Sequence, residues 1–497
     1  MRVSKIAPGT RGTVQLRLPH RSLQRWHLCL AETLIAHGHL VRIDYVDATV
    51  PDVPGLSLVT FFEDALFGAQ TVADLSEPVG ALAFGSFVSA MTPRVVIDCT
   101  GAPQPDTAGR VLVPDFDGQL LANGALGALL EKRMPGIGWR RVSDNALVCH
   151  GRAANAQPHM LGRSFNQTLG RLISMAPTAV RSIQEPGLAL PQEPGRPANL
   201  FGVSRHMAGT FTNRLMRRLT RNIGAGAQWN IGWRNIERGK GLLATASLEP
   251  ETYRWLPRKT GSYLADPFPF EHQGKIWLFA EEFPYATGKG IISVAECAAD
   301  GTPGPFRPVL EAGYHLSYPA VFARDGQIYM IPETTENRTL ELYRADPFPD
   351  RWVLQGVLAE DVSWADTTLF DHGGRVWLMT TTTDCGGSDR DNLCLFHASR
   401  FGDPFEPHPM NPVVVDARGA RPAGWMERDH GGKWLRPAQD CSGGYGWGLM
   451  IARIDRLDRE AYQETILARI PPPASLKATG LHTVNRSGAF EAIDAIL

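Results

Sequence analysis

The strongest constraint on the fold is a repeat of about 50 residues in the second half of the chain. Each repeat opens with a short motif of a polar residue and Pro or Thr, followed by a Gly-containing turn and a strand with Trp or Tyr. The openings fall at Asp266, Tyr318, Asp366 and Pro422, at intervals of 48 to 56 residues, and a further strand pair begins near His482. Strand hairpins that recur at this interval are typical of propeller blades. The sequence from about Leu264 onward therefore predicts an all-β five-bladed propeller.

The strand content of the repeats predicts how the propeller closes. A second hairpin follows most openings, with the sequences GIISVAEC, TLELYRA, NLCLFHAS and GLMIARI, so each blade is expected to have four strands. The last segment is short of strands and must be completed from elsewhere in the chain. Residues Gln228–Arg234, just before the first blade, are the candidate closing strand. Closure by strands from both ends would protect sheet edges that are otherwise free to pair with other chains.

The first 180 residues follow a different pattern, in which strand-like and helix-like stretches alternate. Val14–Leu18 and Val41–Val46 read as strands on either side of a helix at Leu23–Ala36, and Arg94–Thr100 reads as a buried strand. Further helices are expected at 119–132 and 164–173. This alternation predicts an open α/β sheet. The predicted organisation is an α/β domain over 1–183, a linker with a helix over 184–227, and the propeller over 228–497.

The segment between the two domains has two parts. Residues 184–199 hold four Pro and two Gly, which is typical of a linker. Residues 203–221 carry apolar side chains at i, i+4 spacing together with Arg214, Arg217, Arg218 and Arg221. The favoured interpretation is a connecting helix packed on a domain. The alternative is a basic face that makes peripheral contact with anionic lipid headgroups or phosphates.

Composition limits the partners and the compartment. The net charge is −1, so a nucleic-acid partner is not expected, because its phosphates require a basic face. The seven Cys are scattered and form no CxxC pair, so the sequence predicts reduced thiols and neither a disulfide framework nor a zinc site. The first twenty residues hold no apolar core of a secretion signal, and no apolar run reaches the ~18 residues that span a bilayer. We therefore expect a cytoplasmic protein, at most peripheral at the inner membrane face.

Carboxylates at the blade openings are the main candidates for chemistry. The innermost strand of each blade runs along the axis, so the openings, including the Arg421–Pro422 segment, are expected to converge there. Glycoside chemistry needs one carboxyl group to donate a proton and another to activate a nucleophile or stabilise a cationic centre. Asp266, Asp366 and Glu333 are the predicted catalytic residues. No bound metal or other cofactor is expected, because the DRDN run at 389–392 lacks a DxD context and neither GxGxxG nor a P-loop is present.

Other polar and aromatic residues near the repeat openings are predicted to bind substrate. Aromatic side chains, including Trp277 and Trp425, could stack on sugar faces, and Arg436 could hold a phosphate through two parallel hydrogen bonds. Structural alternatives stay open: the two aspartates could cap local turns, Arg436 could pair internally with Asp440, and His482 could be a structural residue. The predicted substrate-binding residues are Glu281, Glu282, Tyr318, Trp364, Arg436, Gln439, Asp440 and His482.

The motifs in this region also carry a family resemblance. The series ADPFPF, GKIWLFAEE, SYP, PET, WADTTLF, RPAQDC and YGWG resembles the N-terminal domain of plant glucosamine inositolphosphorylceramide transferases and its bacterial relatives, over roughly 228–497. That domain is itself similar to five-bladed furanosidase propellers such as glycoside hydrolase family 43. The resemblance implies a base at Asp266 and a second aspartate at Asp366. The furanosidases take an acid Glu from a later blade, where this chain offers Arg436, Gln439 and Asp440, so simple hydrolysis is disfavoured.

The N-terminal region is similar to the formyltransferase-like domain that bacteria often fuse to this propeller. The resemblance rests on RVVIDCTG, VLVPDFDG and RSFNQTLGRL. The Asn-x-His-Pro core that such an enzyme needs is missing, which implies a degenerate domain serving as a scaffold or interaction module.

Together these observations predict a carbohydrate-active enzyme. A glycosyltransferase in surface polysaccharide or glycolipid assembly is favoured, with an activated or lipid-linked sugar donor and a glycan or lipid acceptor. The alternatives are a furanoside glycosidase and a non-catalytic sugar-binding scaffold. The sequence leaves open the donor, the acceptor, the stereochemical outcome and the oligomeric state.

Overall fold

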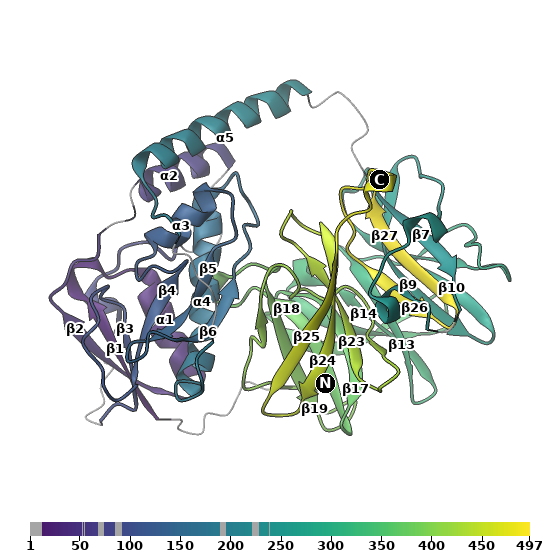
Figure 1. Cartoon of the computed structure of the whole chain (residues 1–497). Coiled ribbons are helices and arrows are strands. Elements are labelled where there is room, and N and C mark those ends of the chain that lie inside the picture. Colours follow the sequence, from purple (N-terminus) through teal and green to yellow (C-terminus); the bar gives the residue numbers. More distant parts are fainter. Residues whose placement is uncertain are drawn as a thin grey trace.

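The structure is a computed structural model that describes residues 12–51, 53, 55–67, 74–84, 92–188, 195–220, 228–237 and 239–497, with the side chains of 211–220 not described. An N-terminal α/β domain and a C-terminal five-bladed β-propeller lie side by side (Figure 1). Both parts of the predicted fold class are therefore confirmed. Of the predicted linker, 189–194 and 221–227 lie outside the described residues. No described helix is both long enough and apolar enough to cross a membrane.

The N-terminal domain is built on one mixed sheet with the strand order β2-β1-β3-β4-β5-β6. The strands β2, β1, β3 and β4 are parallel to one another, and β5 runs antiparallel to both of its neighbours, β4 and β6. Parallel neighbours need long crossover connections, which explains the strand–helix alternation of the sequence. The antiparallel pair β5–β6 was not predicted. The strands are β1 (Thr13–Pro19), β2 (Leu40–Val46), β3 (Val95–Asp98), β4 (Val111–Phe116), β5 (Gly136–Arg141) and β6 (Leu147–Arg152).

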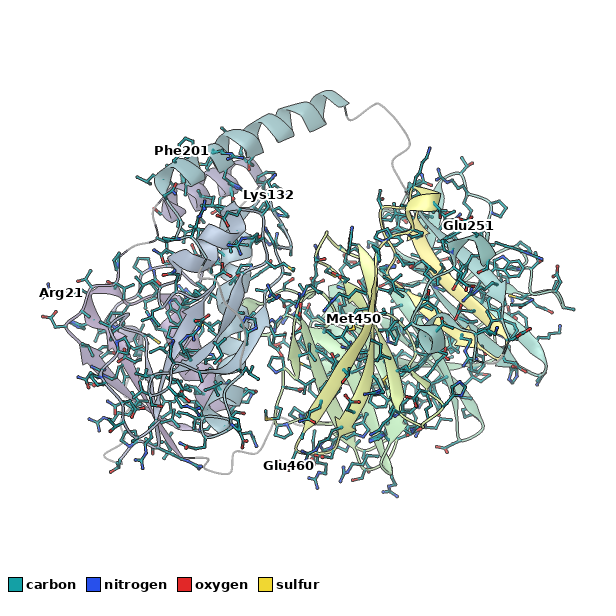
Figure 2. The ribbon with its side chains drawn as sticks, in the orientation of Figure 1. Arg21, Lys132, Phe201, Glu251, Met450 and Glu460 are labelled. Atoms are coloured by element: carbon teal, nitrogen blue, oxygen red, sulfur yellow. The ribbon has the colours of Figure 1, made fainter. Side chains whose placement is uncertain are left out.

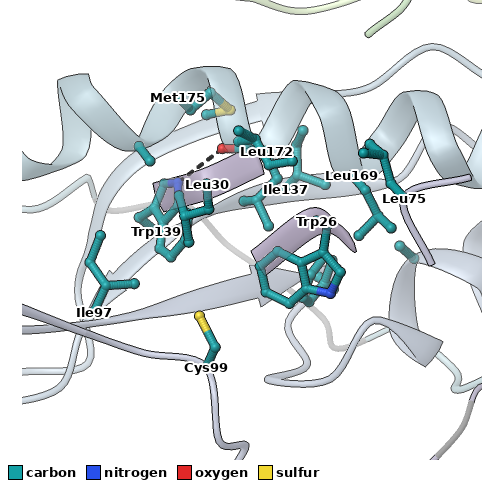
Figure 3. Close-up of a cluster of buried hydrophobic side chains, with 14 of the residues drawn as sticks. Trp26, Leu30, Leu75, Ile97, Cys99, Ile137, Trp139, Leu169, Leu172 and Met175 are labelled. Atoms are coloured by element: carbon teal, nitrogen blue, oxygen red, sulfur yellow. Dashed lines mark hydrogen bonds between the residues drawn. The ribbon is translucent and has the colours of Figure 1, made fainter. Parts of the chain in front are cut away.

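The helix α4 forms the centre of this domain. It is buried along most of its length, and the indole N–H of Trp139 on β5 donates to the carbonyl oxygen of Leu172 over 3.1 Å (Figure 3). Its first turn is capped by the buried Glu63, whose carboxylate accepts the backbone N–H groups of Leu161 and Gly162. A carboxylate stabilises a helix N-terminus because the first N–H groups lack partners within the helix. The helices are α1 (Arg25–Ala36), α2 (Leu56–Phe67), α3 (Asn123–Leu130), α4 (Leu161–Arg181), α5 (Leu200–Thr220) and α6 (Leu242–Thr245), with 3-10 turns at His20–Ser22, Ala81–Phe84, Pro250–Thr252, Thr335–Asn337, Asp384–Gly386 and Ala474–Leu476.

Five sheets form the propeller, one per blade. Blade 1 contains β9 (Ser262–His272), β10 (Lys275–Pro284), β11 (Ile291–Glu296) and β12 (Arg307–Leu310). Blade 2 contains β13 (Ser317–Arg324), β14 (Gln327–Glu333), β15 (Thr339–Ala345) and β16 (Trp352–Glu360). Blade 3 contains β17 (Trp364–His372), β18 (Arg375–Thr382), β19 (Asn392–Ala398), β20 (Glu406–Pro407) and β21 (Val414–Val415). Blade 4 contains β22 (Glu427–Arg428), β23 (Trp434–Asp440), β24 (Gly448–Leu457) and β25 (Tyr462–Ile470).

Blade 5 is assembled from both ends of the propeller sequence. It contains β26 (Val484–Ser487) and β27 (Phe490–Ile496) from the C-terminus, and β7 (Trp229–Asn235) and β8 (Arg254–Trp255) from before blade 1. β27 pairs with β7 along its whole length. The predicted closing strand is therefore confirmed, and the pairing fastens the first blade to the last.

The repeat openings are β-bulges at equivalent positions of blades 1, 2 and 3. Asp266, Tyr318 and Asp366 have positive φ angles of 49°, 45° and 52°. At each of them, two residues of the inner strand face one residue of the next strand. A bulge turns the extra side chain away from the regular alternation of the strand. Left-handed backbone at non-glycine residues costs free energy and is found most often at functional sites.

The two domains are joined by a buried ion pair. Arg171 on α4 donates through Nε to Asp391 of blade 3 over 2.8 Å, and neither side chain is exposed to solvent. Arg171 also donates to the carbonyl oxygens of Thr382 and Ser388, and the other Asp391 oxygen accepts the backbone N–H of Ala154. Such a pair is geometrically demanding, because each buried charge needs several hydrogen bonds. The interface therefore fixes the loop before β19 relative to the N-terminal domain.

Candidate active site at the propeller axis

Asp266, from the first blade, is held by groups from the blades on either side. Its Oδ2 accepts the backbone N–H of Tyr318 over 3.1 Å, and its Oδ1 accepts the hydroxyl of Thr483 over 2.7 Å. Its own backbone N–H donates to Asp494 over 2.9 Å. Asp266 therefore joins blades 5, 1 and 2 and does not cap a local turn. Burial raises its pKa to about 6, and the positive charge of His482 works against this increase.

Asp366, from the third blade, is held mainly by blade 4. Its Oδ2 accepts Nε of Arg421 over 2.6 Å and Nε2 of Gln439 over 2.7 Å. Arg421 also donates to Asp389 over 2.9 Å and lies 3.4 Å from Glu333. The side chain of Asp366 thus accepts a charge-assisted hydrogen bond from Arg421, which together with Gln439 fixes its position.

Two glutamates beside these aspartates favour the protonated form. Burial raises the pKa of Glu333 to about 8, and burial together with neighbouring carboxylates raises the pKa of Glu281 well above its usual value. Glu333 also accepts the backbone N–H of Asp366 over 3.2 Å. Pairs of carboxyl groups whose surroundings push their pKa values apart are the arrangement that acid–base catalysis uses. The axis therefore holds both candidate proton donors and candidate proton acceptors.

His482 lies between two carboxylates. Its Nδ1 is 2.7 Å from Asp494 and its Nε2 is 3.7 Å from Asp266. Although burial opposes it, the charges of Asp494 and Asp266 raise the pKa of His482 to about 9, so the imidazolium balances part of the negative charge. These three residues are also the one group among the described residues whose ligand atoms lie close enough to hold a metal ion. Asp494 already accepts the backbone N–H groups of Asp266, His482 and Thr483. The Asp494 oxygens that could bind a metal ion therefore already accept hydrogen bonds from the backbone.

Gln439 and Tyr445 add a polar and an aromatic feature to the site. Gln439 is buried, and its Oε1 has no hydrogen-bond partner among the described protein groups. Tyr445 is 39% exposed, and its ring covers the guanidinium of Arg421 at 5.0 Å and meets the edge of His482 at 5.5 Å. Trp229 stacks on the other side of the site against His482 at 3.9 Å. Aromatic side chains of this kind provide flat surfaces for sugar rings.

We call the eight residues Asp266, Glu281, Glu333, Asp366, Arg421, Gln439, His482 and Asp494 the axial cluster. Asp266, Asp366, Glu333, Glu281, Gln439 and His482 were predicted as site residues, and the structure brings them together. Tyr318 lies here too, but its hydroxyl is engaged with Thr368 at 2.8 Å and with the backbone N–H of Gly424 at 2.8 Å. Tyr318 thus connects blades 2, 3 and 4.

The structure places the other predicted site residues away from the axial cluster. Glu282 points to the opposite side of β10, where it binds Lys259, Ser262 and Ser293. This follows from the alternation of side chains along a strand.

Trp364, Arg436 and Asp440 also have other partners. Trp364 is buried against Phe396, and Arg436 is fully buried in an ion pair with Glu464 at 2.7 Å. Asp440 accepts the backbone N–H of Ser442 and lies 3.6 Å from Arg469, so the predicted Arg436–Asp440 pair does not form. Trp277 packs with Phe348, and Trp425 packs with Phe268.

Three residues at the site were not singled out from the sequence: Asp389, Tyr445 and Asp494. Arg421 was named only as part of an opening segment. Asp494 had a usable signal, because it is an acid flanked by apolar residues in AIDAIL, the pattern of a buried strand with one polar side chain. Asp389 and Tyr445 lie in loops, where spacing carries no such signal.

Comparison with known proteins gives a match over the propeller. Residues 257–477 match the family model described as glucosamine inositolphosphorylceramide transferase 1, N-terminal. The proteins of that name from Oryza sativa subsp. japonica and Arabidopsis thaliana are both 33% identical, over 207 and 222 residues, which are 41% and 44% of this chain. The matched part is 28% of each relative's own length, so the chain spans less than a third of them.

Two solved structures show the level of structural similarity. The catalytic domain of the GH62 α-L-arabinofuranosidase of Coprinopsis cinerea is 14% identical with a TM-score of 0.36, covering 53% of this chain and 86% of that one. The exo-β-1,3-galactanase 1,3Gal43A of Clostridium thermocellum is 15% identical with a TM-score of 0.35, covering 43% and 53%. By its sequence match, the propeller of this chain resembles the N-terminal domain of glucosamine inositolphosphorylceramide transferase 1.

Proposed function

We propose that this protein is a glycosyltransferase and that the axial cluster is its active site. The observation that carries the proposal is that one cluster holds a proton donor, Glu333, with a pKa raised to about 8, and a buried acceptor, Asp266, with a pKa raised to about 6. General acid–base catalysis is most effective when the pKa of the catalytic group lies near the working pH. The relatives matched by sequence are named as transferases, which favours transfer over hydrolysis.

In the proposed reaction, Asp266 accepts the proton of the acceptor hydroxyl. The hydroxyl oxygen then forms a bond to the anomeric carbon of the donor sugar, and the bond from that carbon to the leaving group breaks. Glu333 gives its proton to the leaving-group oxygen. Asp366, which Arg421 and Gln439 hold in place, would orient the donor sugar.

The names of the relatives suggest the substrates to test first. We propose an amino-sugar donor and a phosphoinositol-containing sphingolipid acceptor, within the broader class of glycolipid or surface polysaccharide precursors. The proposal includes a cytoplasmic location at a membrane, which fits the seven cysteines, all of which are free. In this proposal the N-terminal domain is a scaffold, and its similarity to formyltransferases stays a prediction.

A second candidate is a non-catalytic sugar-binding domain. Two observations favour it: the match covers only 28% of the relatives' length, and the polar groups of the axial cluster already hydrogen-bond across the blades. A scaffold of this kind would bind a sugar without changing it.

The test is to incubate the purified full chain with a panel of nucleotide sugars and phosphoinositol sphingolipids and to identify products by mass spectrometry. A glycosylated lipid that is absent with Asp266→Asn and present with Glu427→Gln supports the proposal, since Glu427 is a paired glutamate outside the cluster. Saturable sugar binding without product would favour the scaffold. Release of free sugar from a nitrophenyl furanoside would instead indicate a hydrolase.

A further inference from the structure

The α/β domain has a groove that the axial cluster does not explain. Its volume is about 850 Å³, and it lies between the end of α3, the loop at 158–159, the segment 196–199 and the start of α5. Lys132, Arg196 and Arg205 line it and are exposed, and none of them forms an ion pair with a described carboxylate. Glu131 is the acidic residue of the lining, and it is paired with Arg133. The groove therefore presents three positive side chains that no described carboxylate neutralises.

The helices α2 and α5 carry large exposed apolar side chains. On α2, Leu58 is 57% exposed and Phe61 is 74% exposed; on α5, Leu200 is 63% exposed and Phe201 is 78% exposed. We call these four residues and the three groove cations the α2–α5 surface.

The start of α5 connects the groove to the apolar side chains, and α2 packs against α5. Phe201 lines the groove as well as projecting outward, and Figure 2 shows Phe201 and Lys132 at the same end of the domain. The helices α2 and α5 run side by side, with Gly55 packed against Val203 between them (Figure 1). At the other end of α2, Phe67 contacts the ring of His159, which also lines the groove. Large exposed apolar side chains that cluster next to polar ones mark an interaction site.

The positive charge of α5 limits the classes of partner that can bind the α2–α5 surface. Its 21 residues include Arg205, Arg214, Arg217 and Arg218 and contain no Asp or Glu. A second copy of this chain would bring Lys132, Arg196 and Arg205 face to face with the same three cations, which disfavours self-association. A free soluble anion would satisfy the groove but would leave the phenyl and leucyl side chains in water.

We propose that the α2–α5 surface docks on a membrane that contains anionic phospholipids. Lys132, Arg196 and Arg205 bind headgroup phosphates in the groove. Phe61, Phe201 and their leucine neighbours enter the boundary between headgroups and acyl chains. This combination of basic and bulky apolar residues on a helix surface is what holds peripheral proteins at a bilayer. The inference does not depend on the transfer reaction proposed above.

Sedimentation of the full chain with vesicles tests this inference. Phosphatidylcholine vesicles with added phosphatidylglycerol should bind the chain, and pure phosphatidylcholine vesicles should bind it much less. Binding should fall by roughly tenfold or more in Arg196→Glu/Arg205→Glu, because each basic residue near an anionic surface adds to the attraction. Phe61→Ser/Phe201→Ser should lower binding to a similar degree. Added salt should weaken the wild-type binding.

Matched controls come from the exposed surface of the propeller. Arg400→Glu and Leu354→Ser change an exposed arginine and a half-exposed leucine far from the groove, and both should bind as the wild type does. The proposal is overturned by equal binding to both vesicle types, by no binding, or by groove and phenylalanine variants that bind like the controls. Self-association that the phenylalanine variants abolish, without vesicle binding, would also overturn it and would identify a second copy as the partner.

Discussion

At the scale of single residues, the carboxylates at the axis differ in whether a cation lies beside them. Asp366 accepts hydrogen bonds from Arg421, and Asp494 is paired with His482. Four other carboxylate residues influence the pKa of Glu281, and Glu333 shares Arg421 with Asp366 and Asp389. Since burial without full charge compensation favours the neutral carboxyl group, one cluster can hold both protonation states.

The role of Glu333 as a proton donor can be tested with its amide. In Glu333→Gln the side chain keeps its shape and can still accept the backbone N–H of Asp366. We expect the transfer rate to fall by about 100-fold or more, the usual contribution of a general acid. The melting temperature should change little, and Glu427→Gln should keep full activity. An unchanged transfer rate in a folded Glu333→Gln protein would remove Glu333 from the mechanism.

His482 predicts a loss of stability at alkaline pH. Its folded pKa of about 9 lies above the ordinary value of 6.5, so its stabilising contribution is complete below pH 6.5 and is lost as the pH rises through 9. The full difference corresponds to about 3 kcal/mol of unfolding free energy. Asp266 and Glu333 also have raised pKa values, so their ionisation lowers stability as the pH rises. This effect is complete at about pH 6 for Asp266 and at about pH 8 for Glu333.

Working above about pH 8 avoids the ionisation of Asp266 and Glu333, and the comparison with His482→Gln separates the histidine from Glu281, whose pKa is also raised. Urea unfolding from about pH 8 to about pH 10 should show falling stability in the wild type and a flatter profile in His482→Gln. Identical slopes for the two proteins would show that the imidazole carries no raised pKa.

At the scale of elements, the same bulge recurs in three blades and directs one side chain of each to the axis. The fourth blade uses another device. Gly424 has φ +130°, and its backbone N–H donates to the hydroxyl of Tyr318. A Cβ at this position would lie 2.1 Å from the carbonyl oxygen of Val484 in blade 5. Backbone conformation and close packing both require glycine here.

Gly424→Ala should therefore destabilise the propeller strongly. The forced shift of the backbone of Val484 and the strained φ angle together should cost about 3 kcal/mol or more of unfolding free energy. The matched control is Gly356→Ala on β16, where a Cβ meets no atom within 4 Å and the φ angle is not in the glycine region. Chemical denaturation of the two variants measures the difference, and equal stability would contradict the packing argument.

The recurring bulge also explains how far sequence reasoning could go. The repeat placed Asp266, Tyr318 and Asp366 at equivalent positions, and the strand pattern predicted the closing strand at Gln228–Arg234, where the structure has β7. Neighbouring candidates could not be separated, because the face that a strand residue presents depends on register. Glu281 and Glu282 are adjacent, and the bulge between Phe279 and Glu281 decides which one faces the axis.

In blade 4 the sequence offered two arginines, and the prediction named Arg436, which the structure places away from the axial cluster. Arg421 lies directly before Pro422, which forms an isolated β-bridge with Ala438, and this position brings its guanidinium to Asp366. Arg436 on β23 instead forms an ion pair with Glu464 on β25. Both are buried arginines with carboxylate partners, and only the pairing of strands distinguishes them.

At the scale of the whole molecule, one loop connects the N-terminal domain to the axis. Asp391 is bound by Arg171 of α4, and two residues earlier Asp389 is bound by Arg421 of the axial cluster. A displacement of this loop would change the environment of Arg421 and therefore of Asp366. The N-terminal domain would then contribute to the site without supplying a residue to it.

This connection predicts that Arg171→Met weakens the whole protein as well as the interface. The substitution leaves Asp391 buried without its cation, which costs about 3–5 kcal/mol. Calorimetry should show separate unfolding of the two domains in Arg171→Met and more cooperative unfolding in the wild type. Asp391→Asn on the same background should restore part of the loss, because an amide oxygen can still accept the N–H of Ala154 and carries no charge.

The exposed pair Arg338–Asp361 supplies the control, since surface ion pairs contribute under about 1 kcal/mol and Arg338→Met should leave the profile unchanged. If Arg171→Met melts like this control, the two domains are not energetically coupled through the loop. If it is destabilised and the double variant recovers, the cost arises from the uncompensated carboxylate. The residual transfer rate then tells whether the loop acts on the axial cluster, because Arg421 can hold Asp366 in place only while Asp389 stays in position.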